Sequence, residues 1–307
     1  MTADWSGVFP AVTTKFKDDH SLDLEATEEH LEAQIEAGVH GLVMLGTLGE
    51  SASLSTEEKH EVVQTALSVS DGRVPVLAGV AETTTAAACE FVERGASYGA
   101  DGFMLLPGLL YHSDRRETLR HFRAVAEVSE RPLMIYNNPV AYDVDTTPEM
   151  FAELAEEETI VAIKESSNDV RRITDLINRT GDRYQLFCGV DDLALESLLM
   201  GVVGWVAGLV NAFPEETVAI YELATAGRIE EAREIYRWFA PLLHLDVSTK
   251  LVQNIKLAEA MVGIGTEPVR PPRLPLAGEE RTRVKQITEQ GIENRPDLDA
   301  YDLPNSA

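Results

Sequence analysis

Basic residues are scarce in this chain, and their scarcity excludes several classes of partner. The 307 residues include 26 Lys and Arg against 52 Asp and Glu, which gives a formal net charge of −26. Such a charge repels nucleic acid and acidic membrane surfaces, so we expect neither as a partner. The acidic excess is typical of proteins from a salt-rich cytoplasm and equally of ordinary solubility charge, and it does not identify a reaction.

Cysteine and clustered histidine are also lacking. Cys89 and Cys188 are the only cysteines and lack the spacing of a metal site, and the seven histidines form no H-x-x-H or H-E-x-x-H motif. We therefore expect no disulfide framework, no metal and no cofactor.

Long apolar runs are missing as well. The longest, such as residues 201–210, are too short and glycine-rich to span a bilayer. The first residues, MTADW, contain no basic segment followed by an apolar one, so no secretory signal is visible and we expect a cytoplasmic protein. Hydrophobic residues make up 44% of the chain, which is ample for a core.

Short apolar runs, in contrast, recur regularly along the chain. They cover residues 8–14, 41–46, 75–80, 102–107, 132–137, 160–166, 184–189 and 204–209. Helical signals separate them, such as the capping box STEE at 55–58 and Pro148, which suits the first position of a helix. Eight alternations of strand and helix predict an α/β protein, a (β/α)8 TIM barrel. The alternative is a doubly wound sheet, but the G-x-G-x-x-G of a dinucleotide site is missing.

Beyond the last of these runs the pattern is helical only. Helices are expected at residues 214–226, 229–243 and 248–262, and from about Leu276 onwards. The first completes the eighth unit, so we assign residues 1–225 to the barrel and 226–290 to a C-terminal helical extension. Residues 291–307 are acidic and interrupted by proline, and a mobile tail is expected there.

The leading candidate for a reactive group is Lys164, which ends the apolar run IVAIK at 160–164. Such a run is typical of a parallel strand covered on both faces. The ordinary pKa of lysine is about 10.4, and apolar neighbours lower it and expose an amine that can form a Schiff base. The simpler alternative is that Lys164 ends a strand and points into water.

Other polar residues also end strand-like runs, where barrel active sites lie. If Tyr136 and Lys164 both point inward, strands about 4.8 Å apart bring the phenol within reach of a group bonded to the amine, where it can transfer protons. The GTLG turn at 46–49 can bind a substrate carboxylate through its backbone N–H groups. The alternatives are an ordinary turn and, for Glu50, a surface or helix-start carboxylate.

Three motifs together carry a resemblance. GTLGE at 46–50, YNNP at 136–139 and IKE at 163–165 resemble the dihydrodipicolinate synthase and N-acetylneuraminate lyase superfamily, from about residue 8 to 276. The resemblance implies a Schiff-base lysine at Lys164, a proton-transferring tyrosine at Tyr136 and a hydroxyl relay at Thr47. It also implies a homotetramer that binds a small 2-oxo or cyclic imino acid. The substrate-binding residues expected with it are Gly46, Leu48, Gly49, Glu50, Asn138, Gly189 and Val206.

The chain departs from the synthase branch of this superfamily. That branch has a second threonine where this chain has Leu48, and where this chain has Ala141 it has an arginine that holds the carboxylate of the aldehyde substrate. It also has a tyrosine pair just after the proline that corresponds to Pro107, whereas the next tyrosine here is Tyr111. These differences disfavour a role in lysine biosynthesis and leave open the third member of the hydroxyl relay.

Longer stretches resemble Δ1-pyrroline-4-hydroxy-2-carboxylate deaminases of hydroxyproline breakdown. They cover residues 45–50, 111–118, 136–142, 187–192 and 204–212. We therefore expect a deaminase that forms 2-oxoglutarate semialdehyde and ammonia after Lys164 attacks C2 of the cyclic imine. The alternatives are a pyruvate-dependent aldolase of 2-keto-3-deoxy sugar acids, dihydrodipicolinate synthase itself, and a non-catalytic sensor of a small oxo acid.

Overall fold

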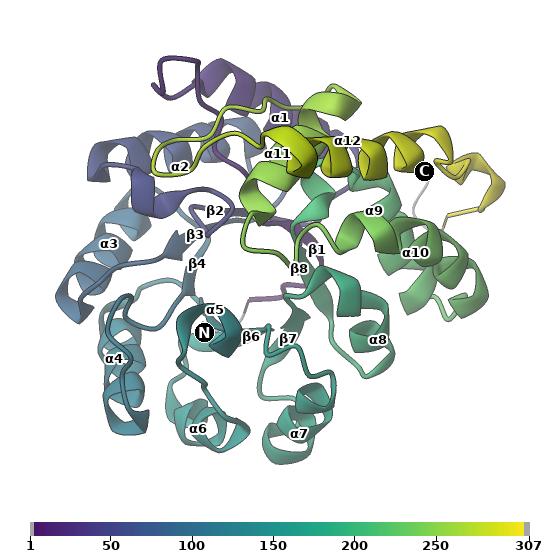
Figure 1. The fold of residues 1–307 in the computed structure, drawn as a ribbon. Helices are drawn as coiled ribbons and strands as arrows, with labels where there is room; N and C mark the ends of the chain where they lie inside the picture. Colours follow the sequence, from purple (N-terminus) through teal and green to yellow (C-terminus); the bar gives the residue numbers. More distant parts are fainter. Residues whose placement is uncertain (1–2, 304–307) are drawn as a thin grey trace.

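Eight parallel strands form one sheet in the order β1-β8-β7-β6-β5-β4-β3-β2 in the computed structural model, which describes residues 3–303. A parallel bridge between Ala11 and Val43 joins the two ends of this sheet, so the strands surround a common axis (Figure 1). The strands are β1 (Gly7–Pro10), β2 (Leu42–Met44), β3 (Val76–Val80), β4 (Gly102–Leu105), β5 (Leu133–Asn137), β6 (Ile160–Glu165), β7 (Gln185–Cys188) and β8 (Gly204–Ala207).

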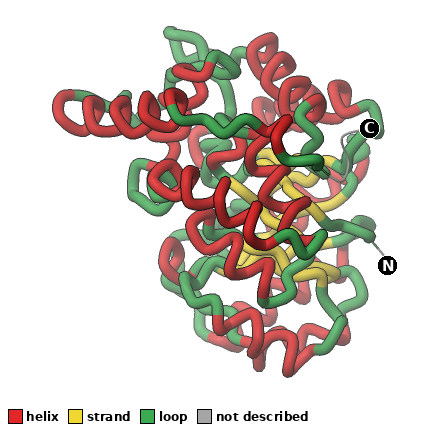
Figure 2. Tube along the Cα trace, turned by 90° about the vertical axis from the view of Figure 1, so that its right-hand side faces the viewer, coloured by secondary structure: helices red, strands yellow, loops and turns green. Residues whose placement is uncertain are grey.

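Helices alternate with the strands and cover the barrel from outside (Figure 2). They are α1 (Leu24–Glu36), α2 (Thr56–Ser70), α3 (Thr85–Ser97), α4 (Arg115–Val128), α6 (Pro148–Glu153), α7 (Arg171–Thr180), α8 (Ala194–Leu199) and α9 (Pro214–Thr225), with the short α5 (Pro139–Tyr142) in the loop after β5. The capping box at Ser55 and Glu58 begins α2, and Pro148 begins α6. The predicted (β/α)8 barrel is confirmed.

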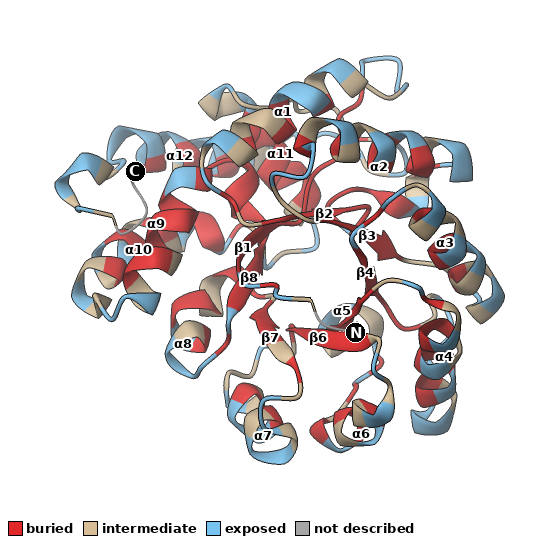
Figure 3. Ribbon diagram, turned by 180° about the vertical axis from the view of Figure 1, so that it is seen from behind, coloured by how far each residue is buried: buried red, intermediate tan, exposed pale blue. Residues whose placement is uncertain are grey.

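The strands are buried on both sides, which explains their continuous apolar sequences (Figure 3). All six residues of β6 are buried, including Lys164 at the position before its last residue. One side of each strand faces the packed interior of the barrel and the other faces the helices. A lysine in such a strand is held among apolar neighbours, whereas the outer faces of the helices carry the acidic residues that water solvates.

Three further helices follow the barrel: α10 (Ile229–Leu243), α11 (Leu251–Val262) and α12 (Gly278–Glu293). α10 packs on α9 and α12, and α11 packs on α12. The division into a barrel of residues 1–225 and a helical region of 226–290 stays a prediction. A 3-10 turn follows at Leu298–Ala300, and residues 304–307 of the expected tail lie outside the described residues. Within residues 3–303, no helix has both the length and the apolar composition needed to cross a membrane.

Candidate active site

Lys164 and Tyr136 meet inside the barrel. They are paired in the register between β6 and β5, and Nζ of Lys164 lies 4.1 Å from the centre of the Tyr136 ring. Both side chains are buried. A Cβ atom on Gly189, just after β7, would lie 2.6 Å from Cε of Lys164, so a glycine is needed there to leave room for the lysine.

The surroundings of Lys164 favour its neutral amine. Burial lowers the pKa of Lys164 to about 8, against the opposing effect of the Asp246 and Asp191 carboxyls. An amine with this pKa is deprotonated far more often at neutral pH than an exposed lysine, and only the free base attacks a carbonyl carbon. The geometry and the lowered pKa together are those that a nucleophilic lysine needs.

The YNNP motif positions the Tyr136 phenol. Nδ2 of Asn138 donates a hydrogen bond of 2.9 Å to the Tyr136 hydroxyl, while Oδ1 of Asn138 accepts one of 3.0 Å from the backbone N–H of Ala141 and caps α5. Pro139 occupies the first turn of that helix. Burial raises the pKa of Tyr136, so the phenol carries its proton at neutral pH and is available as a donor.

A second tyrosine, Tyr142, stands beside Tyr136 in this site. Its ring packs edge-on against that of Tyr136 with centres 5.8 Å apart, and its hydroxyl lies 2.6 Å from Oγ1 of Thr47. The Tyr111 side chain is 63% exposed and its hydroxyl donates to Glu117 on α4. In the described chain the neighbour of Thr47 is therefore Tyr142, within the stretch at 136–142 already noted, and not Tyr111.

Two adjoining cavities lie at the carboxyl ends of the strands. The inner one, of about 50 Å³, is lined by Lys164 together with Gly46, Leu48 and Val206. The outer one, of about 440 Å³, is lined by Asn138 and Tyr142 together with residues 246–249 of the α10–α11 loop. Five residues line both: Thr47, Tyr136, Gly189, Asp246 and Leu251. A larger hollow of about 730 Å³ lies between α6 and α7 and contains neither Lys164 nor Tyr136.

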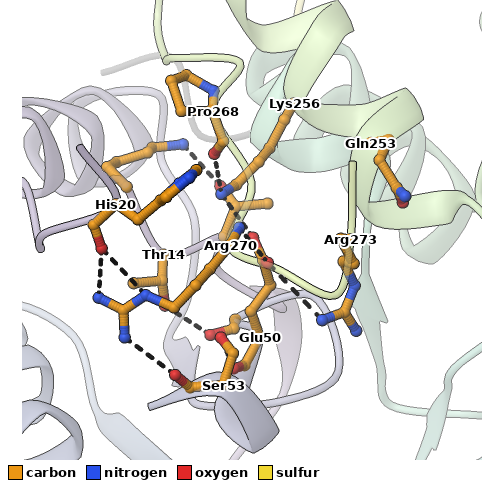
Figure 4. Close-up of polar contacts among 12 residues, drawn as sticks. Thr14, His20, Glu50, Ser53, Gln253, Lys256, Pro268, Arg270 and Arg273 are labelled. Carbon is orange, nitrogen blue, oxygen red and sulfur yellow. Dashed lines mark hydrogen bonds and ion pairs between the residues drawn. The ribbon is translucent and has the colours of Figure 1, made fainter. Parts of the chain in front are cut away.

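Glu50 and Gly49 do not line either cavity. The Glu50 carboxylate is buried and accepts hydrogen bonds from Nζ of Lys256 at 2.7 Å and from the backbone N–H of Arg270 at 3.1 Å (Figure 4). Arg273 approaches the same carboxylate at 3.7 Å. The structure thus places Glu50 in an ion-pair cluster that ties the turn after β2 to α11 and the segment that follows it.

Asp246 is a candidate site residue that sequence reasoning missed. It lies in the α10–α11 loop, where neither strand periodicity nor a motif marks it. Nearby, the buried Asp191 carboxylate accepts hydrogen bonds from Nε1 of Trp205 at 3.0 Å and from the backbone N–H of Leu209 at 2.7 Å. Both carboxyls lie close enough to Lys164 to stabilise its charged form.

A buried lysine near the end of β6 beside a protonated phenol from β5, in a (β/α)8 barrel with C-terminal helices, defines a Schiff-base lyase. The sequence comparison gives the family: the Dihydrodipicolinate synthetase family matches residues 4–291, and the chain belongs to it.

Several named relatives are similar over nearly the whole chain. The 4-hydroxy-tetrahydrodipicolinate synthase of Methanothrix thermoacetophila is 36% identical over 282 residues, which cover 92% of this chain and 95% of that protein. The enzyme of the same name from Natronomonas pharaonis is 36% identical, with coverage of 94% and 98%. The structure of the 4-hydroxy-tetrahydrodipicolinate synthase of Methylacidiphilum fumariolicum matches with a TM-score of 0.90 at 30% identity, covering 94% of this chain and 97% of that chain.

These relatives overturn the expected Δ1-pyrroline-4-hydroxy-2-carboxylate deaminase. Proteins that match more than nine-tenths of the chain carry the synthase name, so the prediction of a hydroxyproline-degrading deaminase was wrong. The physical reason is that most of the stretches on which this prediction rested lie at strand ends. They form the part of the site around Lys164 and Tyr136. Substrate choice depends instead on loop contacts to the distal end of the ligand.

Proposed function

We propose that this protein is a pyruvate-dependent Schiff-base enzyme that catalyses the reaction named for its relatives, 4-hydroxy-tetrahydrodipicolinate synthesis. The observation that carries the proposal is the buried Lys164 amine 4.1 Å from the Tyr136 ring, in a cavity at the carboxyl ends of the strands. The relatives' names support this activity.

The reaction follows from the groups that line the inner cavity. The neutral Lys164 amine attacks C2 of pyruvate, and loss of water gives an imine. The cationic imine makes the neighbouring methyl group acidic, so Tyr136 and the Thr47–Tyr142 hydroxyl pair can pass its proton and leave an enamine. The enamine carbon then attacks the aldehyde carbon of aspartate semialdehyde. The backbone of Gly46, Thr47 and Leu48, which line the inner cavity, is the proposed site for the pyruvate carboxylate.

A second candidate is an aldolase that acts on 2-keto-3-deoxy sugar acids through the same imine. The specific observation in its favour is the lining of the two cavities, in which Lys164 is the one described cationic side chain and Ala141 occupies part of the outer wall. The carboxylate of aspartate semialdehyde lacks a cationic partner there. The hydroxyl groups of a sugar-derived aldehyde could form hydrogen bonds with Ser166, Thr249 and Asn138, which line the outer cavity.

A substrate panel separates the two. Purified protein is given pyruvate with aspartate semialdehyde in one assay, and a 2-keto-3-deoxy sugar acid in another, and condensation product and released pyruvate are measured. Efficient condensation supports the synthase. Efficient pyruvate release without condensation supports the aldolase, and neither activity contradicts both. The homotetramer implied by the family resemblance stays a prediction for both.

A further inference from the structure

Asp246, an acidic residue at the site, has a carboxyl oxygen without a hydrogen-bond partner in the described part of the chain. The Asp246 carboxyl lines both the inner cavity, which contains Lys164, and the outer cavity that adjoins it. Its Oδ1 atom is buried, and no group within residues 3–303 forms a hydrogen bond with it. A buried polar oxygen without a partner destabilises the folded protein, so its persistence at a reactive site calls for a functional reason.

The position of Asp246 is tightly fixed by the barrel. A Cβ atom on Gly208, just after β8, would lie 2.4 Å from Oδ1 of Asp246, so the loop between α10 and α11 packs against a strand end that must be glycine. The other polar side chains at the junction of the cavities are already engaged, since Thr47 contacts Tyr142 and Tyr136 accepts from Asn138. Asp246 is thus the acid at this junction with an open hydrogen-bonding position.

The charges around Asp246 favour its protonated form. Burial and the neighbouring Asp191 carboxylate raise the pKa of Asp246 well above the ordinary value, with Asp192 acting in the same direction and Lys164 against it. Asp191 is held by backbone and Trp205 N–H donors, which favour its ionised form. When two carboxyls share a buried site and only one is fully hydrogen-bonded, the proton resides on the other.

We infer that the Asp246 carboxyl is the catalytic acid that protonates the departing hydroxyl group when Lys164 forms its imine with a 2-oxo acid. This inference rests on the Schiff-base function proposed above and assigns one step of it to a residue of the C-terminal helical region.

The step begins when the Lys164 amine adds to the carbonyl carbon and a proton moves from nitrogen to oxygen, which gives a carbinolamine. The carbinolamine oxygen takes the proton of the Asp246 carboxyl, the C–O bond breaks, and water leaves. The nitrogen lone pair forms the C=N bond at the same time. A neutral amine and a neutral carboxyl become an iminium cation and a carboxylate, and their attraction stabilises the imine in a medium of low polarity.

The test measures how fast the imine forms. Protein is mixed with pyruvate, quenched with borohydride after increasing times, and the fraction carrying the added mass is read by mass spectrometry. Asp246→Asn keeps the shape of the side chain but cannot give up a carboxyl proton, so we expect imine formation to slow about 10²- to 10⁴-fold, the range for loss of a general acid. Asp169→Asn, a carboxyl that pairs with Arg171 and lines neither cavity, is the matched control and should trap pyruvate at the wild-type rate.

The sign of the effect distinguishes the inference from a purely electrostatic role. A carboxylate that only stabilised the charged lysine would, when removed, leave more free amine and give equal or faster trapping, and that result would overturn the inference. In Asp246→Ala, added formate should restore part of the rate, and failure to do so would also contradict it. If the wild-type protein takes up no label at all, the proposed Schiff-base function fails, which is a separate result from equal rates in wild type and Asp246→Asn.

Discussion

Nζ of Lys164 lies 4.1 Å from the centre of the Tyr136 ring because the parallel register of β6 on β5 sets these residues side by side. This places the amine over an aromatic face, and Tyr136 lines both cavities. The proposed nucleophile and the proposed proton carrier therefore lie on adjacent strands of the barrel rather than in loops.

Tyr136→Phe should separate imine formation from turnover. The substitution keeps the ring beside Lys164 and removes only the hydroxyl, so the fold and the trapped imine should survive. Turnover should fall about 10²- to 10⁴-fold because the proton carrier is lost. Steady-state kinetics and borohydride trapping on the same preparation check this, and a nearly unchanged kcat would mean that another group moves the proton.

Thr47→Val and Tyr142→Phe should each reduce kcat by less than Tyr136→Phe, because both act on the same hydroxyl pair, 2.6 Å apart. The double variant should be little slower than either single one, since both remove one shared interaction. Tyr111→Phe is the control, because that exposed hydroxyl donates to Glu117 and Tyr111 lines neither cavity. Strictly additive losses would show that Thr47 and Tyr142 act independently.

The rate of imine formation should rise with pH as pH approaches about 8 from below. The pKa of Lys164 is lowered to about 8 by burial, so the protonated amine predominates below that value and the reactive free base above it. Trapping of pyruvate at a series of pH values measures this directly. A rate that still rose steeply toward the pKa of ordinary lysine, about 10.4, would contradict a desolvated Lys164.

Glu50→Gln should affect stability far more than substrate affinity. Glu50 and Lys256 are both fully buried and pair at 2.7 Å, so removal of the carboxylate charge leaves a buried ammonium without its partner. Such a loss typically costs about 3–5 kcal/mol of unfolding free energy. Denaturant unfolding of Glu50→Gln measures it, with Glu57→Gln on the exposed side of α2 as the control. A normal stability with a strongly raised KM would instead favour the substrate-binding role first expected of Glu50.

The sequence predicted the barrel because each buried strand is a short apolar run and each helix begins at a recognisable signal. Alternation along a strand also predicted that Lys164 and Tyr136 lie near each other, since it fixes which side chains face inward. The sequence could not place Glu50, which adopts a left-handed φ of 52° and turns away toward Lys256, far along the chain. Asp246 was missed for a similar reason, because its position depends on how α10 and α11 pack over the strand ends.

The central claim, that Lys164 forms the imine, is tested most directly by mapping the borohydride-trapped pyruvate adduct to a peptide. The chain has seven lysines, and three others are buried: Lys256 pairs with Glu50, Lys15 with Glu259 and Lys59 with Glu82. None of these three lines the cavity that contains Lys164, so the predicted result is added mass on the Lys164 peptide alone, and none in Lys164→Ala. Label on Lys15, Lys256 or any other lysine, or label that persists in Lys164→Ala, would contradict the account.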